Sequence, residues 1–86
     1  MFYVYILYSK SIDRYYIGQT KNLRDRLTRH NNSSTRFTSR AKDWEIVFTE
    51  EFPTRSEAMK RESQIKCQKS RKFIEELISH AEGRRD

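Results

Sequence analysis

The segment 2–8 is apolar on both of its faces, and this constrains the fold more than any other feature of the sequence. Its side chains alternate in two sets, and both sets are apolar or aromatic: Phe2, Val4, Ile6 and Tyr8 on one face, and Tyr3, Tyr5 and Leu7 on the other. Because successive side chains of a strand point to opposite faces, this pattern predicts a strand that is covered on both sides. We therefore expect packed layers above and below a sheet.

Two further segments complete the predicted sheet. The polar residues 9–14 can turn the chain, and residues 15–19 then form a second strand, in a hairpin whose loop is longer than the tight two-residue kind. Residues 44–52 are rich in β-branched and aromatic side chains and predict a third strand, which Pro53 ends.

Three helices are expected around these strands. Asn22 can cap a short helix with Leu23 and Leu27 on its buried side, which fades over 31–34. The run 54–57, Thr-Arg-Ser-Glu, has the spacing of a capping box and predicts a helix from about residue 55 towards 69. Ser70 can cap a third helix, which ends at Gly83. Its apolar stripe is Phe73, Ile74, Leu77, Ile78 and Ala81.

These elements predict one α/β (α+β) domain, a small three-stranded sheet flanked by about three helices. A chain of 86 residues encloses only one modest core, and with 35% hydrophobic but 13% aromatic residues that core should be thin and rich in rings. We assign the domain to residues 1–80 and expect a short basic C-terminal tail over 81–86.

The charge balance points to a polyanionic partner. Lys and Arg number 18 against 12 Asp and Glu, a formal charge of +6 on a small surface. Such a field favours nucleic acid, although an ordinary basic protein shows the same balance. Cys67, the single cysteine, excludes an intrachain disulfide and a cysteine-rich zinc site, which fits a reducing cytoplasm. The N-terminal residues resemble neither a signal peptide nor a membrane span.

Several polar residues stand at positions where a purely structural pattern predicts something else. Glu62 occupies the inward stripe of the second helix; the ordinary alternative is a stripe-edge residue that pairs with Lys66 one turn on. Arg26 and His30 are four residues apart and border the apolar stripe of the first helix, as a snorkelling arginine and a partly buried ring also would.

The strand tyrosines and one glycine form a second group. Tyr5 and Tyr16 can lie close together on one face of the hairpin, either as core aromatics or as hydroxyl groups offered to a site. Gly18 is a poor strand former and marks a bulge or a place where a backbone or a phosphate comes close. The basic segment 36–42 suits phosphate contact, or is an ordinary solvated loop.

Taken in order, these residues resemble the GIY-YIG endonuclease superfamily, and the likeness extends over about residues 2–78. It rests on Tyr3-Val4-Tyr5, Tyr16-Ile17-Gly18, Asn22-Leu23 with Arg26 and Leu27, His30-Asn31, and Ser56-Glu57-Ala58 leading to Glu62, Ile65 and Lys66. Two positions depart from the family pattern. Tyr3 stands where the name-giving first glycine belongs, and no asparagine follows the glutamate helix, because the last asparagine is Asn32.

The resemblance implies an antiparallel sheet and a phosphodiesterase site that uses Mg²⁺ or Mn²⁺, with Glu62 as the metal ligand. It implies that Tyr5 accepts a proton from water, that Tyr16 and His30 position water or phosphate, and that Arg26 stabilises charge. Because an unperturbed tyrosine pKa is about 10, the resemblance implies that the bound metal, Arg26 and Lys66 lower that of Tyr5.

The expected activity is nucleic-acid hydrolysis in DNA repair, recombination or processing, with DNA preferred over RNA. The residues expected to contact nucleic acid are Gly18, Lys21, Arg29, Arg36, Arg40, Lys42 and Lys66. Two alternatives stay open, a binding module that cuts weakly or not at all and a subunit that needs a protein partner. No membrane partner and no particular oligomeric state are predicted.

Overall fold

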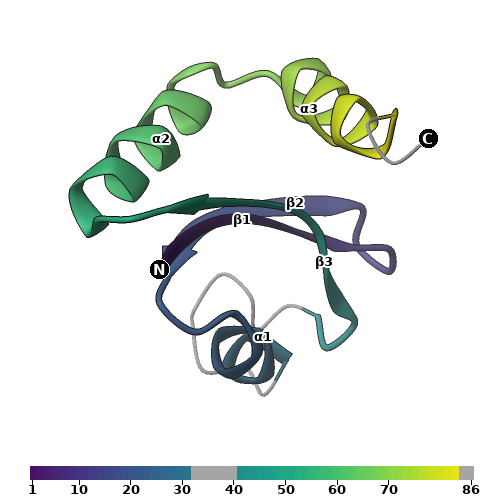
Figure 1. Cartoon of the computed structure of the whole chain (residues 1–86). Helices are drawn as coiled ribbons and strands as arrows, with labels where there is room; N and C mark the ends of the chain where they lie inside the picture. The colour runs from purple at the N-terminus through teal and green to yellow at the C-terminus, as the bar shows by residue number, and fades with distance from the viewer. Residues whose placement is uncertain (32–40, 84–86) are drawn as a thin grey trace.

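The computed structural model describes residues 1–31 and 41–83, which form three strands and three helices (Figure 1). In chain order the elements are β1 (Phe2–Ser9), β2 (Arg14–Thr20), α1 (Leu23–Asn31), β3 (Trp44–Phe52), α2 (Arg55–Cys67) and α3 (Arg71–Gly83). The predicted α+β fold is confirmed.

The three strands form one antiparallel sheet in the order β2-β1-β3. The first strand therefore lies in the middle, and this explains why both of its faces are apolar. Figure 1 shows α1 on one side of the sheet and α2 and α3 on the other. The sheet consequently has a covering layer on each face, as the alternation of segment 2–8 predicts.

Each side of the sheet has its own core. On the α1 side, Tyr5, Leu7 and Trp44 are buried, with Leu23 and Leu27 packed against them. On the α2–α3 side the buried residues are Val4, Ala58 and Ile65, and the partly buried side chains around them include Ile17, Phe73 and Leu77. Because β1 supplies Val4 to one core and Tyr5 and Leu7 to the other, the central strand joins the two layers.

The hairpin and the third strand pair with different regularity. Tyr5 faces Gly18 in an unbroken β1–β2 register, whereas the β1–β3 register shifts between Ile6 and Leu7. The extra residue on β3 is Val47, which lies between the partners of Ile6 and Leu7. Of the two alternatives at Gly18, the bulge is therefore excluded, because the irregularity lies on the other edge of β1.

The helix starts are capped as predicted. The side-chain oxygens of Asn22, Thr54 and Ser70 accept hydrogen bonds from backbone N–H groups three residues on, at 3.0, 3.3 and 3.1 Å. Each bond satisfies one of the donors that a first helical turn leaves unpaired.

The end of α2 falls short of the expected residue 69, whereas α3 ends at Gly83 as expected. α2 stops at Cys67, and the chain then takes the left-handed conformation at Lys69, with φ 48°. α3 continues through Gly83, so the domain boundary expected at residue 80 falls inside this helix. The side chain of Ala81 lies outside the described residues. In the described parts of the chain, no helix combines the length and apolar character needed to cross a membrane.

Candidate nucleic-acid active site

A hydrogen bond between β1 and α1 forms the centre of the candidate site. The Tyr5 hydroxyl lies 3.0 Å from Nε2 of His30, and both residues are buried, at 2% and 0% exposure. Tyr5 is held by the central strand, and His30 by the last turn of α1, which Leu23 and Leu27 fasten to the same face. Two separate elements thus fix the phenol and the imidazole against each other.

Tyr16, from the edge strand β2, joins this pair. Its ring centroid lies 4.7 Å from that of His30 and 6.4 Å from that of Tyr5. The two phenols therefore lie on one face of the hairpin, as the sequence predicts. Tyr16 is partly exposed whereas Tyr5 is not, so Tyr16 is the more accessible of the two hydroxyl groups.

Gly18 makes room for the Tyr5 ring. A Cβ at this position would lie 2.5 Å from the Tyr5 hydroxyl oxygen and 2.7 Å from Cζ, closer than such atoms approach. The sequence suggested that a backbone or a phosphate comes close here. In the structure it is the Tyr5 phenol that occupies this space, so Gly18 determines where the phenol lies.

Burial dominates the electrostatics of Tyr5. The pKa of its phenol is raised, first by burial and then by Tyr16 and the Glu62 carboxylate, while the charge of Arg26 opposes the rise. Arg26, one of the cations expected to lower this pKa, acts in that direction but does not outweigh burial. The same interactions place Arg26 and Glu62 within electrostatic range of the Tyr5 hydroxyl.

His30 is held in its neutral form. Burial lowers its pKa, and the neighbouring Arg26 guanidinium lowers it further. A neutral imidazole has one ring nitrogen free of a proton, so Nε2 can accept the Tyr5 O–H when the ring proton resides on Nδ1. The phenol can thus donate a hydrogen bond to the imidazole, and the raised pKa of Tyr5 and the lowered pKa of His30 both keep the proton on the phenol.

Glu62 is placed on α2, in the layer opposite α1. Its carboxylate oxygen lies 2.7 Å from Nζ of Lys66, with the glutamate side chain 21% and the lysine side chain 52% exposed. The ordinary alternative from the sequence, pairing one turn on, is therefore what this helix shows. The Glu62 charge also contributes to the raised pKa of Tyr5, after burial and Tyr16.

The donor set fits a cation that needs few protein ligands. In the described residues no three histidine, cysteine or carboxylate side chains gather into a metal-binding group. Mg²⁺ keeps several waters and takes phosphate oxygens, so a single partly exposed carboxylate such as Glu62 suits it. Zinc, with its usual four side-chain ligands, does not fit this arrangement.

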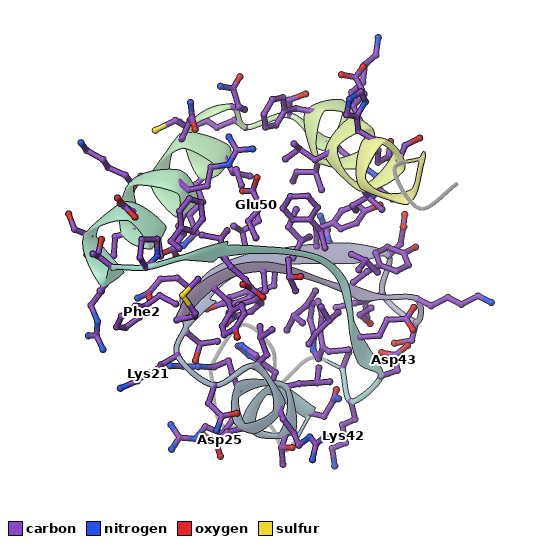
Figure 2. The ribbon with its side chains drawn as sticks, viewed as in Figure 1. Phe2, Lys21, Asp25, Lys42, Asp43 and Glu50 are labelled. Carbon is purple, nitrogen blue, oxygen red and sulfur yellow. The ribbon has the colours of Figure 1, made fainter. Side chains whose placement is uncertain are left out.

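The cations expected to contact nucleic acid are only partly brought together. Lys21 and Lys42 are exposed and lie on the α1 side of the sheet (Figure 2). Arg29, on α1, forms an exposed ion pair with Asp25 at 3.3 Å. Lys66 lies on α2 instead. Arg36 and Arg40 lie outside the described residues.

Two polar anchors near the site were not foreseen. The Asn31 side chain brackets Trp44, donating to its carbonyl oxygen at 3.0 Å and accepting from its N–H at 2.7 Å, which fastens the end of α1 to the start of β3. Asp43 accepts hydrogen bonds from the hydroxyls of Ser9 and Ser11, at 2.6 and 2.9 Å. Both anchors join residues that are distant in the sequence. Of these residues only Asn31 was marked by the sequence, because it follows His30 in the motif that resembles the family.

The class is defined by the three-stranded antiparallel sheet and by the order along the chain of the two tyrosines, the arginine, the histidine and the helix glutamate. The chain belongs to the GIY-YIG family, whose catalytic domain matches residues 1–75. This family is a nuclease superfamily whose substrates are nucleic acids and whose members generally use divalent metals.

Within this class, the chain is similar to UPF0213 proteins. Those of Staphylococcus saprophyticus and Staphylococcus haemolyticus are each 37% identical to it over 78 residues, which cover 86% of this chain and 94% of each relative. The solution NMR structure of a UPF0213 protein from Bacillus halodurans is 33% identical, with a TM-score of 0.57. This similarity covers 92% of this chain and 84% of that one.

Proposed function

We propose that this protein is a divalent-metal-dependent endonuclease that hydrolyses phosphodiester bonds of nucleic acid, with DNA as the expected substrate ahead of RNA, in repair, recombination or processing. One observation carries the proposal: the buried hydrogen bond between Tyr5 and His30, with Tyr16 against the imidazole and the charges of Arg26 and Glu62 acting on the phenol. Titratable groups with shifted pKa values that gather in one place are typical of functional sites.

In the proposed reaction Tyr5 takes a proton from the attacking water while it passes its own proton to Nε2 of His30. The water oxygen forms a bond to phosphorus, and the bond from phosphorus to the leaving oxygen breaks. The leaving oxygen takes a proton from solvent, and His30 afterwards releases to solvent the proton that it received. Because the phenol never has to ionise beforehand, its raised pKa does not block the step. Arg26 stabilises the negative charge that develops on the phosphate.

Glu62 would hold the divalent cation, Mg²⁺ or Mn²⁺, which supplies charge stabilisation at the phosphate when bound. Its ion pair with Lys66 must then open or be shared. Tyr16 is a second candidate for the water proton, because it is partly exposed and in contact with His30. Cys67, a free and exposed thiol, suits a reducing cytoplasm.

The test is cleavage of supercoiled plasmid, branched DNA and RNA in Mg²⁺ by the wild type and by Tyr5→Phe, Tyr16→Phe and Glu62→Gln, all purified identically. Removing a general base should slow cleavage by about 10² to 10⁴. The Glu62→Gln protein controls for a contaminating nuclease, because it keeps the shape of the side chain but loses the charge.

Equal cutting by the wild type and Glu62→Gln on every substrate would refute the endonuclease. Salt-sensitive binding without cutting would then favour a binding module. A large loss in Tyr16→Phe with none in Tyr5→Phe would assign the water proton to Tyr16.

A further inference from the structure

Four basic side chains gather on the α2–α3 side of the sheet, and one of them, Lys66, contacts Glu62. A cleft of about 470 Å³ opens between β2 and the junction of α2 with α3. Its basic side chains are Arg14, Lys66, Lys69 and Arg71. They come from three different elements and from the α2–α3 connection, so only the folded chain brings these four cations to one place.

The cleft pairs this basic lining with an apolar one. Ile17, Ile65 and Ile74 line it, and so does the ring of Tyr15. Cations beside apolar and aromatic surface are the arrangement by which proteins hold single-stranded nucleic acid, with phosphates on the charges and sugars or bases on the rings. The size of the cleft lies within the range of pockets that hold small ligands or parts of larger ones.

Two of the four cations, Arg14 and Lys69, can bind an anionic ligand without first breaking an ion pair to another described residue. Arg71 is bound to Asp13 at 2.6 Å and to Glu75 at 3.2 Å, with its guanidinium 5.2 Å over the Tyr15 ring. These contacts tie the start of α3 to the β1–β2 turn and so fix the cleft wall. Among the described residues, no ion pair engages Arg14 or Lys69.

Lys69 stands in a conformation that glycine adopts more readily. Its φ of 48° at the end of α2 is the left-handed region, where a side chain is disfavoured. A lysine here places a charge on the cleft at a conformational cost. Lys66, one turn earlier, links the cleft to Glu62, because its ammonium lies 2.7 Å from that carboxylate.

We propose that this cleft binds a phosphate of the nucleic-acid strand that is cleaved at the candidate active site. The strand crosses the β2 edge, and Arg14 and Lys69 hold this phosphate, while Lys66 lines the cleft and contacts Glu62. The inference rests on the proposed function for the identity of the ligand, but it concerns binding and is tested without cleavage.

The experiment measures binding of a fluorescein-labelled single-stranded thymidine 12-mer in EDTA, by anisotropy, between 50 and 200 mM salt. The test variant is Arg14→Ala with Lys69→Gly, because glycine suits the backbone at residue 69. The matched control is Lys60→Ala with Lys72→Ala, which removes the same charge from exposed positions outside the cleft. Circular dichroism checks that both variants are folded.

Each contact to a single-strand phosphate contributes about 0.7 to the slope of log affinity against log salt concentration. Loss of two contacts should therefore reduce this slope by about 1.4, which corresponds to about 25-fold weaker binding at 0.1 M salt relative to 1 M salt. The control should change affinity less than about twofold and leave the slope intact. Equal slopes for the two double variants would overturn the proposal, as would a wild type that does not bind. A reduced slope in a protein that cuts nothing would support the cleft and refute the endonuclease.

Discussion

Gly18 shows at the scale of single residues how a missing side chain determines the position of a catalytic candidate. The Tyr5 phenol lies where a Cβ of residue 18 would be, at 2.5 Å from the hydroxyl oxygen. The ring is also fixed by its bond to His30, so it cannot move away without breaking that bond.

We therefore expect Gly18→Ala to lower the free energy of unfolding by about 1–3 kcal/mol, the usual cost of overpacking. Urea unfolding measures the change. Gln19→Ala, the next position of β2, is the control and should stay within about 0.5 kcal/mol. A Gly18→Ala protein as stable as the wild type would show that the phenol has another place to lie.

His30 predicts a dependence of stability on pH. Its pKa is lowered in the folded protein by burial and by Arg26, whereas in the unfolded chain it is close to 6.5. Below that pH the unfolded state binds more protons than the folded state, so stability is full above about pH 6.5 and is lost as pH falls towards the folded pKa.

Urea unfolding at pH 7.5, 6.5 and 5.5 tests this, with His30→Gln as the comparison. The wild type should lose stability between pH 6.5 and 5.5, and the variant should lose less. Asp13 and Asp43 also have lowered pKa values, but they titrate in a more acidic range and do not confuse the result. If the stability of the wild type and that of His30→Gln depended on pH in the same way, His30 would not be held neutral.

At the scale of elements, the junction between α2 and α3 combines a good cap with an unfavourable backbone. Replacing Lys69, whose φ is 48°, by glycine should raise the free energy of unfolding by about 1 kcal/mol. Gln68→Gly is the matched control, because residue 68 has φ −66° and gains nothing from glycine. A destabilised Lys69→Gly protein would indicate that the lysine side chain itself stabilises the fold.

At the start of α2, a substitution should lower stability rather than raise it. Thr54→Ala removes the hydroxyl that accepts from the Glu57 N–H and should cost about 1 kcal/mol, measured by thermal or urea unfolding. Ser56→Ala lies two residues further on, inside the helix, and should be neutral or slightly stabilising. Equal effects at the two positions would argue that the Thr54 cap carries no stability.

At the scale of the whole molecule, the two cores should melt together. β1 contributes side chains to both, so neither layer can separate without exposing the central strand. Leu27→Ala on the α1 side and Leu77→Ala on the α3 side should each cost about 2 kcal/mol, near the lower end for buried leucines because both are partly buried.

The measurement is urea unfolding followed by far-ultraviolet and near-ultraviolet circular dichroism. Both probes should give one coincident transition in each variant, as expected for a small two-state domain. Glu76→Ala, exposed beside Leu77, is the control and should change stability by less than about 0.5 kcal/mol. Separate transitions would show that the layers are independent.

The sequence was most informative where the physics is local. The apolar alternation of segment 2–8 and the capping residues Asn22, Thr54 and Ser70 depend on neighbours within a few positions, so they predicted the sheet and the helix starts correctly. The ordered tyrosine, arginine, histidine and glutamate motifs predicted the GIY-YIG family, which is confirmed over residues 1–75.

Other features depend on contacts between distant segments, and these only the tertiary structure decided. That Tyr5 is buried against His30 and fills the space beside Gly18 follows from how α1 packs on the sheet, and this burial raises a pKa that the sequence suggested was lowered. The bulge on β3 and the basic cleft at the β2 edge likewise arise where separate elements meet. Periodicity and helix capping depend on residues that are close in the sequence, so the sequence shows them. Desolvation and the packing of one side chain against a distant residue arise only once the chain is folded.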